Sequence, residues 1–351
     1  MALTLNITMT HNPFSYCKNP RRDMLGRSPI ELIRHFNQPA HIHITGKDST
    51  RCRVVVSLLH GNEPSGLNAL FHLIQQEVEP AVDVHCFLPN IRAALEEPTF
   101  THRALPGSRD MNRCFKPPFD DDPGQIAKAL LETITALQPE AVIDIHNTSG
   151  SGPSFGVTTY MDDKHDALVS LFTQKVIVTD LQLGALMEIS EPLCPTVTIE
   201  CGGSEDEEST RMADEGLLKY FTYKHVLYGE HTDIALDFYH LPVRLELSDK
   251  ANGILGFGDL PGQQGGLTLR TDIEHFNFGE VSPKQYLGFI AEDDLSMLTA
   301  KTTSGEEKLF DYFQVIDGKL HPREKLKLFM ITTKAAIARS DCLFYLVPAR
   351  Q

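Results

Sequence analysis

A histidine and a glutamate spaced three residues apart follow a strongly apolar segment, and together they could bind a metal ion. Residues 53–66 read RVVVSLLHGNEPSG, so His60 and Glu63 come directly after a run of valines and leucines. Such a run is typical of a strand buried on both faces of a parallel sheet. Side chains at the carboxyl end of that strand reach the crevice where open α/β sheets bind ligands. The imidazole and the carboxylate supply two ligands of a zinc site and leave room for a third.

The same spacing occurs a second time, at His321 and Glu324. No buried strand is predicted before this second copy, which lies in a charged segment. Because a motif of this length is common by chance, its structural context decides its meaning. We therefore expect no metal ion at the second copy.

A third ligand is predicted at His146. Residues 141–146 (AVIDIH) form an apolar strand that ends in this histidine, directly before a Gly/Ser-rich turn. Asp144 alternates to the same side of the strand, where its carboxylate could hold the second nitrogen of the imidazole. His85 follows Asp83 at the same spacing, but an apolar CFL tripeptide continues its strand. We therefore expect His85 to pack in the core and His146 to reach the site.

A glutamate ends a further apolar strand. Residues 195–200 (PTVTIE) finish in Glu200, just before Cys201 and two glycines. A carboxylate in this position is costly unless it is paired or takes part in chemistry, although it could also simply reach solvent at the strand end. The residues alone leave both interpretations open.

Taken in order along the chain, these motifs resemble the succinylglutamate desuccinylase/aspartoacylase family, a branch of the zinc carboxypeptidase superfamily. The matching segments are residues 60–63 (HGNE), 109–115 (RDMNRCF), 144–148 (DIHNT) and 198–202 (TIECG). The resemblance covers residues 50–205 and extends loosely to the C-terminal part. It implies a zinc carboxypeptidase-like α/β fold, with a mixed sheet flanked by helices and a smaller, mostly β C-terminal domain.

The resemblance also implies a metal centre and a catalytic base. One zinc ion per chain would be held by His60, Glu63 and His146, with water in the fourth position. Glu200 would be the general base and later the proton donor. These roles agree with elementary chemistry, because zinc acidifies bound water and polarises an amide oxygen, and a nearby carboxylate can accept the proton.

Three residues between His60 and His146 would contact the substrate, namely Asn112, Arg113 and one loop arginine. The resemblance implies that Asn112 and Arg113 contact a substrate carboxylate, for which a guanidinium is suited because it binds in a bidentate manner. A loop arginine should stabilise the charge on the scissile carbonyl. Arg103 is the first candidate and Arg109 the second, because the loop does not match the family spacing cleanly.

The expected activity is that of a zinc-dependent hydrolase, an amidohydrolase or deacylase that removes an acyl group from a small N-acyl amino acid or N-acyl amine. Members that act on acidic substrates carry a further arginine shortly before the base, whereas residues 187–195 (MEISEPLCP) contain none and carry Glu188 and Glu191 instead. Neither aspartoacylase nor desuccinylase activity is therefore assumed. A zinc carboxypeptidase, which shares these motifs, and a non-catalytic zinc- or ligand-binding relative stay open as alternatives.

The elements that must position these residues alternate along the chain. Apolar patterns predict strands at residues 40–45, 53–60, 82–88, 141–146, 176–178 and 195–200, and helices at residues 29–36, 65–77, 125–137, 164–175 and 204–228. The strand at 40–45 places His41 and His43 on one face, which we expect to be half exposed. Residues 90–123 lack periodicity, and a long segment of this kind within a compact domain is usually functional.

The character of the sequence changes near residue 241. Glycines and prolines recur beyond it, and the short alternating stretches at 243–247, 266–270, 286–290 and 343–347 favour strands. We therefore expect two domains, a zinc-binding catalytic α/β domain over residues 1–240 and a smaller β-rich domain over residues 241–351.

Composition limits the partners of the chain. The 351 residues carry a formal net charge of −15 and no Lys/Arg cluster, which argues against a nucleic-acid partner. We find no apolar run long enough to span a membrane and no secretory signal, so no membrane partner is expected. The seven cysteines are scattered and never spaced as C-x-x-C, which fits a reducing cytoplasm. A small-molecule substrate is expected, and the sequence leaves open whether the chain forms a homo-oligomer.

Overall fold

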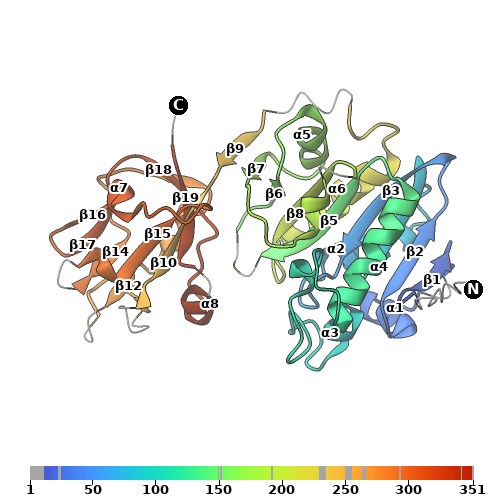
Figure 1. Ribbon diagram of the computed structural model, residues 1–351, viewed down its shortest axis with the longest axis horizontal. Helices are drawn as coiled ribbons and strands as arrows, with labels where there is room; N and C mark the ends of the chain where they lie inside the picture. The colour runs from blue at the N-terminus through green and yellow to red at the C-terminus, as the bar shows by residue number, and fades with distance from the viewer. Residues whose placement is uncertain are drawn as a thin grey trace, which may run out of the picture.

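The computed structural model describes residues 12–22, 25–148, 150, 152–190, 193–228, 235–249, 255–262, 266–291, 294–340 and 342–349. Within these residues, the chain up to His240 forms a nine-stranded sheet with helices, and the chain beyond it forms two five-stranded sheets (Figure 1). None of the helices in the described ranges combines the length and apolarity that crossing a membrane requires.

The large sheet is mixed, as the resemblance implied. Its strands are β1 (Ser15–Lys18), β2 (Ala40–Ile44), β3 (Asp48–Ser57), β4 (Val82–Leu88), β5 (Val142–Thr148), β6 (Phe155–Thr158), β7 (Lys175–Val178), β8 (Thr196–Gly203) and β9 (Asp237–His240). They lie in the order β1-β2-β4-β3-β5-β8-β6-β7-β9. Strands β4, β3, β5 and β8 run parallel to one another, whereas β2 and β6 pair antiparallel with their inner neighbours. Three parallel strands, β3, β5 and β8, therefore end side by side at one edge of the sheet.

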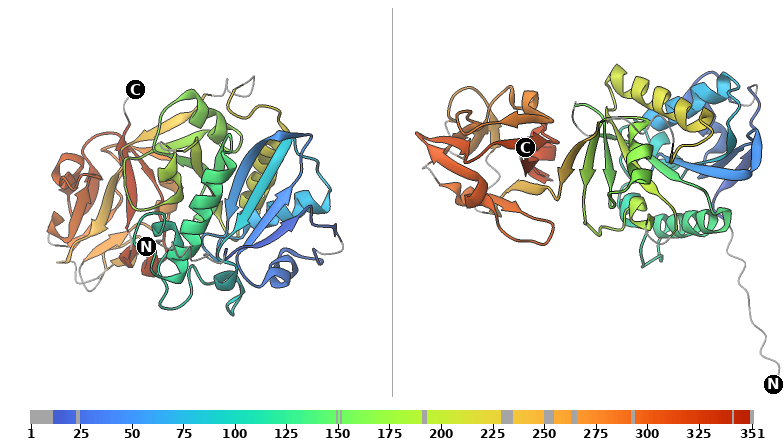
Figure 2. Two further views of the ribbon diagram at one scale, coloured as in Figure 1. Left: turned by 45° about the vertical axis from the view of Figure 1, so that its right-hand side comes forward. Right: turned by 90° about the horizontal axis from the view of Figure 1, so that it is seen from above.

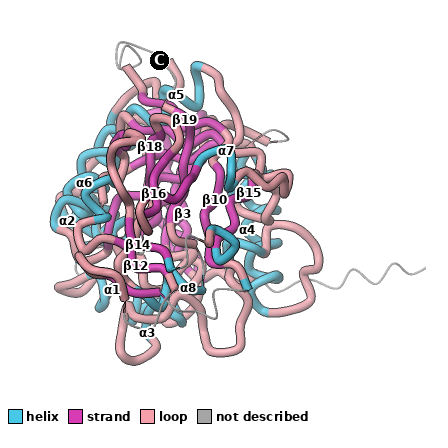
Figure 3. Tube along the Cα trace, turned by 90° about the vertical axis from the view of Figure 1, so that its left-hand side faces the viewer, coloured by secondary structure: helices cyan, strands magenta, loops and turns pink. Residues whose placement is uncertain are grey.

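Helices cover both faces of this sheet (Figures 2 and 3). They are α1 (Pro29–Phe36), α2 (Ser65–Gln75), α3 (Ile91–Leu95), α4 (Asp122–Leu137), α5 (Asp163–Ser170) and α6 (Glu207–Thr222), with short 3₁₀ turns η2 (Met111–Arg113) and η3 (Leu186–Ile189). Val55 of β3 packs in the same cluster as Leu67 of α2 and Leu217 of α6. Val54 packs on the opposite face, in the cluster that contains Leu130 of α4. The valine run is therefore buried on both faces, as its sequence predicted.

The structure differs from the sequence predictions in several places. Strand β3 begins at Asp48 and ends at Ser57, and helix α5 ends at Ser170, before its predicted end at residue 175. Strand β1 lies before residue 29, where no element was predicted, and pairs in parallel with β2. Helix α6 begins at Glu207 and ends at Thr222, shorter at both ends than its predicted range. His41 and His43 are each only 8% exposed, so the prediction of a half-exposed strand face was wrong. The burial arises because β1 and β4 flank β2 on both sides and their side chains cover the two imidazoles.

The C-terminal part is built almost entirely of short strands. They are β10 (Val243–Leu247), β11 (Leu255–Phe257), β12 (Leu267–Leu269), β13 (Gly279–Val281), β14 (Gly288–Ile290), β15 (Leu298–Lys301), β16 (Phe313–Ile316), β17 (Lys319–Pro322), β18 (Leu326–Phe329) and β19 (Phe344–Pro348), with helices α7 (Leu309–Tyr312) and α8 (Ala335–Ser340) and the 3₁₀ turns η6 (Ile273–Phe276) and η8 (Leu295–Met297). The sheets β13-β18-β19-β10-β15 and β11-β12-β14-β17-β16 enclose an apolar core of their own. A small apolar cluster that includes Phe155, Ile177 and Phe329 joins this part to the large sheet. The division into two domains at residue 240 stays a prediction.

Candidate metal centre

The strand ends bring the histidines and glutamates of the three motifs together. His60 and Glu63 lie in the turn between β3 and α2, and His146 lies near the end of β5. Glu200 lies on β8 directly opposite His146 in the strand register. Four side chains that are separated by up to 140 residues thus meet at the carboxyl edge of three neighbouring parallel strands, where open α/β sheets bind their ligands.

The turn after β3 contains a residue with a left-handed backbone and a glycine in close contact with a helix. Leu58 adopts a φ of 57°, in the left-handed region that leucine rarely enters. Asn90 holds this turn by donating its backbone N–H to the Leu58 carbonyl (3.0 Å) and its side-chain amide to the Leu59 carbonyl (3.1 Å). A Cβ atom at Gly61 would lie 2.5 Å from the backbone of α3, so the close approach of this helix requires glycine. The neighbouring segments thus fix the directions of His60 and Glu63.

The three predicted ligands converge on one point. Nδ1 of His60 lies 3.2 Å from Nδ1 of His146, and the Glu63 carboxylate lies 2.9 Å from the first nitrogen and 2.6 Å from the second. All three residues are buried, and they form the one group of metal-ligating side chains of this kind in the described residues. A tetrahedral zinc ion with ligand bonds of about 2.0–2.1 Å holds two nitrogens about 3.3 Å apart. The spacing of the two imidazole nitrogens therefore fits such an ion.

Each histidine is held from behind by an aspartate. Nε2 of His60 lies 2.8 Å from Oδ1 of Asp110, and Nε2 of His146 lies 2.7 Å from Oδ2 of Asp144. A carboxylate on the second nitrogen fixes the orientation of the ring and leaves the first nitrogen free to bind a metal ion. The support from Asp144 was considered in the sequence, whereas the role of Asp110 was missed. Its signal was available, since Asp110 begins the DMNR motif.

The charge of the cluster suits a cation. Burial by itself would raise the pKa of Glu63, but the His60 and His146 imidazoles outweigh it and hold that pKa below its usual range. Burial would lower the pKa of His146, but Asp144 and Glu63 outweigh it and raise that pKa well above its usual value. The site thus keeps the Glu63 carboxylate ionised between the two imidazoles, which is an electrostatic environment that a divalent cation favours.

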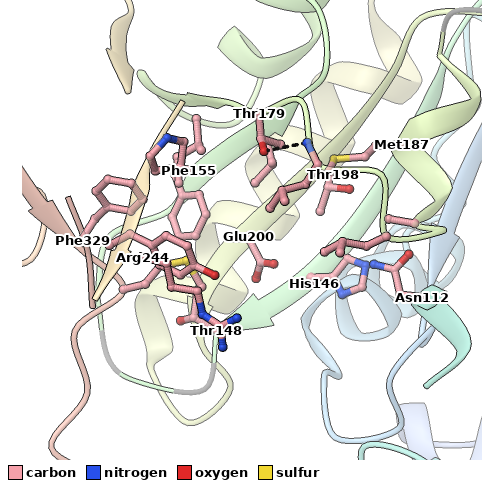
Figure 4. A pocket seen from close by; sticks show the side chains of 18 of the residues that line it. Asn112, His146, Thr148, Phe155, Thr179, Met187, Thr198, Glu200, Arg244 and Phe329 are labelled. Carbon is pink, nitrogen blue, oxygen red and sulfur yellow. Dashed lines mark hydrogen bonds between the residues drawn. The ribbon is translucent and has the colours of Figure 1, made fainter. Parts of the chain in front are cut away.

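Glu200 lies apart from the converging ligands. Burial raises its pKa to about 7, the neighbouring His146 opposes this rise, and the charge of Glu63 adds to it. Its Oε2 atom is buried and has no hydrogen-bond partner among the described residues. Figure 4 shows the carboxylate between His146 on one side and Phe155 on the other, and Glu200 lines the cavity. A half-buried carboxylate whose inner oxygen has no partner, and whose pKa lies near neutrality, is a candidate for proton transfer.

The two candidate arginines differ in position. Arg103 reaches the cluster, with Nη1 3.3 Å from the Glu63 carboxylate and Nη2 2.9 Å from the Asp110 carboxylate. Arg109 points elsewhere, because its Nε donates to Asp121 (2.6 Å) and its Nη2 donates to the Pro118 carbonyl (3.0 Å). Arg103 lines the cavity in front of the cluster, and Arg109 is not among the lining residues.

Asn112 and Arg113 also line this cavity. Asn112 is buried, and its Oδ1 accepts the backbone N–H of Leu186 at 3.0 Å, which leaves its NH₂ group as the polar end that can face a ligand. Arg113 is exposed, and its Nη1 donates to the Asn112 carbonyl at 2.7 Å. The pair therefore lies at the mouth of the cavity, with the amide inside and the guanidinium at the rim.

The cavity has a volume of about 510 Å³ and lies between the two parts of the chain. Phe155 and Met187 line it from the large sheet and its loops, and Arg244, Phe329 and Tyr345 line it from the C-terminal sheets. In Figure 4, Phe329 and Arg244 lie across the cavity from His146 and Asn112. A pocket of this size, with a few convergent polar groups, is suited to a small molecule.

The second His/Glu pair, at residues 321 and 324, and the Asp83/His85 pair both lie away from the cavity. His321 is in β17 and its Nδ1 lies 3.1 Å from the Pro283 carbonyl, while Glu324 is exposed. His85 is in the middle of β4 with its Nδ1 2.9 Å from Nε2 of His41. Neither motif contributes a residue to the cavity.

Comparison with known proteins identifies the fold. No family model matches the sequence, and no curated protein gives a significant match. Solved structures do match. A succinylglutamate desuccinylase/aspartoacylase from Rhodobacter sphaeroides is 16% identical, with 88% of each chain covered and a TM-score of 0.56.

A succinylglutamate desuccinylase from Chromobacterium violaceum is 13% identical, covering 86% of this chain and 85% of that one, with a TM-score of 0.50. Murine aminoacylase 3 is 15% identical, covering 86% of this chain and 96% of that one, with a TM-score of 0.52. The chain therefore has the fold of the succinylglutamate desuccinylase/aspartoacylase proteins, as its motifs predicted.

Proposed function

We propose that the chain is a zinc-dependent hydrolase of the succinylglutamate desuccinylase/aspartoacylase family that removes the acyl group from a small N-acyl amino acid or N-acyl amine. The observation that carries the proposal is the arrangement at the strand ends. His60, Glu63 and His146 converge on one point, and the unpartnered carboxylate of Glu200 faces the same cavity. The shared fold supports the family, and the donor set supports zinc.

His60 and His146 would hold the ion through their Nδ1 atoms and Glu63 through its carboxylate, while Asp110 and Asp144 keep the rings in place. When bound, zinc supplies a Lewis acid that polarises the amide carbonyl and lowers the pKa of water. This chemistry needs two nitrogen ligands in their neutral form, and the aspartates behind them orient the lone pairs inward.

Glu200 would move the proton. Its carboxylate accepts a proton from the attacking water, and the resulting carboxylic acid returns that proton to the nitrogen of the leaving amine. Burial keeps its pKa near neutrality, so that both directions of transfer are accessible. This use of one group as base and then acid requires that no other side chain holds the carboxylate, which agrees with its unpartnered Oε2 among the described residues.

Two arginines would bind the substrate, one on each side of the scissile bond. Arg103 lies beside Glu63 and would stabilise the negative charge that develops on the carbonyl oxygen. Arg113, with the amide of Asn112, would hold a substrate carboxylate. We do not assign Arg109 to the stabilisation of the carbonyl oxygen, because its guanidinium is bound to Asp121 outside the cavity.

The C-terminal sheets narrow the cavity, which favours a small substrate over a peptide chain. Arg244, Phe329 and Tyr345 wall the side opposite the metal ligands. We extend the proposal to a catalytic domain over residues 1–240 and a β-rich domain over residues 241–351 that closes the pocket. The seven cysteines are free thiols, which supports a reducing compartment such as the cytoplasm.

The test is amine release from a panel of N-acyl amino acids that combines acetyl, succinyl and formyl groups with acidic, neutral and basic amino acids. Zinc-loaded protein is compared with Glu200→Gln, and Glu324→Gln is the matched control because Glu324 is an exposed glutamate outside the cavity. We expect turnover in the wild type and the control and its loss in Glu200→Gln. Zinc binding without any turnover would contradict the proposal and would support a non-catalytic binder, and cleavage of long peptides would support a carboxypeptidase.

A further inference from the structure

We propose that the cavity selects substrates whose amino-acid half carries an apolar side chain, and that the segment 181–187 forms the apolar wall. This inference rests on the proposed function and specifies its substrate. Leu181, Leu183, Ala185 and Met187 all line the cavity. They lie in the connection between β7 and β8.

The apolar wall is joined directly to the residues that would hold the substrate carboxylate. Leu186 donates its N–H to Oδ1 of Asn112 (3.0 Å), and Phe115 donates its N–H to the carbonyl of Gly184 (3.0 Å). At Gly184, which has a φ of 83°, a Cβ atom would lie 2.8 Å from the carbonyl oxygen of Arg113. In an amino acid, the side chain and the carboxylate are attached to the same α carbon. A carboxylate held by Asn112 and Arg113 therefore brings that side chain next to the wall.

Glu188, which directly follows this segment, turns its carboxylate back onto the segment's backbone. The Glu188 carboxylate accepts the backbone N–H groups of Leu183 (2.6 Å), Gly184 (2.8 Å) and Ala185 (2.9 Å). These bonds satisfy its charge and fix the backbone that presents Leu183 and Met187 to the cavity. Glu188 is not among the lining residues, and Glu191 lies outside the described residues. The wall is thus both apolar and rigidly held.

The floor next to this wall is also apolar. Thr198 lies two residues before Glu200 on β8 and therefore on the same face. Across the sheet it is paired with Val157 of β6, and Val157 is paired with Ile177 of β7. Figure 4 shows Thr198 and Met187 close together, on the side of Glu200 away from Phe329 and Arg244. The floor thus offers methyl groups next to the catalytic carboxylate.

The cations that line the cavity all come from outside the wall; they are Arg103, Arg113, Arg244 and Lys301. Lys301 lies on β15 and Arg244 on β10, both in the C-terminal sheets. Arg103 is bound to Glu63 and Asp110, and Arg244 forms an ion pair with Glu246 at 2.9 Å on the opposite side. Arg113 is assigned to the main carboxylate of the substrate. An acidic side chain placed against Leu183 and Met187 would lose its hydration and gain no partner from the wall, which is costly. A leucine, methionine or phenylalanine side chain would gain contacts instead.

The test measures kcat/KM for N-acetyl derivatives of leucine, methionine, phenylalanine, alanine, aspartate, glutamate and lysine. The wild type is compared with Leu183→Arg, Met187→Ala and the control Leu218→Arg. Leu183 and Leu218 are both 41% exposed, so neither arginine is forced into a core, and Leu218 lies on α6 outside the cavity. We expect the wild type to prefer the leucine over the aspartate derivative by about a hundredfold, since such pockets discriminate by at least tenfold per group.

In Leu183→Arg we expect kcat/KM to fall about tenfold for the leucine derivative and to rise for the aspartate derivative, whereas Leu218→Arg matches the wild type. In Met187→Ala the leucine derivative should lose about tenfold while the alanine derivative keeps its rate, because only a long side chain reaches the removed contact. This change should appear in KM more than in kcat, as for binding shared by ground and transition states.

Two outcomes overturn the inference and leave the proposed function standing. One is turnover that prefers acidic amino acids in the wild type. The other is a rate that depends on the length of the acyl group and not on the amino acid, which would place the acyl half against the wall. Absence of turnover on every derivative, with zinc bound, would remove the proposed function itself and the inference with it.

Discussion

Two groups of buried histidines lie on the same large sheet and have opposite chemistry. The first contains His60 and His146, at the carboxyl ends of β3 and β5, and the second contains His41, His43 and His85 on β2 and β4. All five histidine residues are at most 8% exposed. Burial and residue type therefore do not separate a candidate metal centre from ordinary packing.

The partners of the ring nitrogens distinguish the two groups of histidines. In the first group, the aspartates bind the outer nitrogens and the two Nδ1 atoms face each other and a carboxylate. In the second group, the nitrogens are bound within the group itself or to neighbours. His41 Nε2 pairs with His85 Nδ1 (2.9 Å), and the two nitrogens of His43 pair with Tyr16 (2.9 Å) and Asp83 (2.8 Å).

The pKa values follow the same division. Carboxylates outweigh burial and raise the pKa of His146 well above its usual value. Burial lowers the pKa of His41 to about 3, with a further decrease from His85 and His43, and burial lowers the pKa of His85 to about 4. A cation is thus favoured at the first group and disfavoured at the second. The carboxylates distinguish the metal centre more than the histidines do. Asp110 and Asp144 contact the outer Nε2 atoms, and Glu63 contacts the inner Nδ1 atoms.

The largest expected effect is the loss of zinc from a variant of the first group. His146→Ala removes one of three protein ligands, so metal analysis after gel filtration should fall from about one zinc per chain to below about a tenth. The matched variant His85→Gln removes a histidine of the second group and should keep its zinc. Full zinc in His146→Ala, or its loss in His85→Gln, would reverse the assignment of the two groups.

The next effect concerns turnover without loss of metal. Glu200→Gln keeps the shape of the side chain but removes the proton acceptor, so kcat should fall by about 10²–10⁴-fold while zinc stays bound. The measurement is amine release together with zinc content on the same sample. A near-normal rate would exclude Glu200 as the base.

A smaller effect is expected for the aspartates that orient the imidazoles. Asp110→Asn should weaken zinc binding by about 10–100-fold, because the outer nitrogen of His60 loses its carboxylate. Competition with a zinc chelator of known affinity measures this change. Asp83→Asn is the control, since Asp83 holds His43 in the second group in the same way. Equal weakening in both variants would point to a general loss of stability.

The smallest effect is a pH dependence of stability in the second group. Because the folded-state pKa values of His41 and His85 lie below the unfolded value near 6.5, the unfolded chain binds protons first as the pH falls. Stability from this group is present above pH 6.5 and is lost below it, down to about pH 4 for His85 and about pH 3 for His41. The loss is about 1.4 kcal/mol per pH unit for each extra proton. Denaturant unfolding of metal-free protein at pH 7 and 5 should show a smaller decrease in His41→Gln than in the wild type. Identical decreases would exclude His41 as a source.

The sequence predicted the strands that carry the site because their patterns are local. The valine run before His60 and the apolar strands before His146 and Glu200 give a strong signal, and each strand end is marked by a polar residue next to a glycine or turn. The helix at Pro29–Phe36 was predicted at its observed bounds, since Ser28 accepts the N–H of Glu31 as its cap.

What the sequence did not predict depends on contacts between distant segments. The burial of His41 and His43 needs β1, a short strand with no apolar pattern of its own. The loop of residues 90–123 has no local pattern that predicts its fold. Its fold brings Asp110 to His60, and it turns Arg109 away from the site towards Asp121. The roles of Arg103, Asn112, Arg113 and Glu200 stay predictions, since geometry places their side chains but does not test their chemistry.

The most direct test of the central claim is an anomalous difference map from crystals grown with zinc and measured at the zinc absorption edge. The account predicts one strong peak per chain, about 2.0–2.2 Å from the Nδ1 atoms of His60 and His146 and from the Glu63 carboxylate. A peak between His41 and His85, or no peak at the strand ends at full zinc, would contradict it.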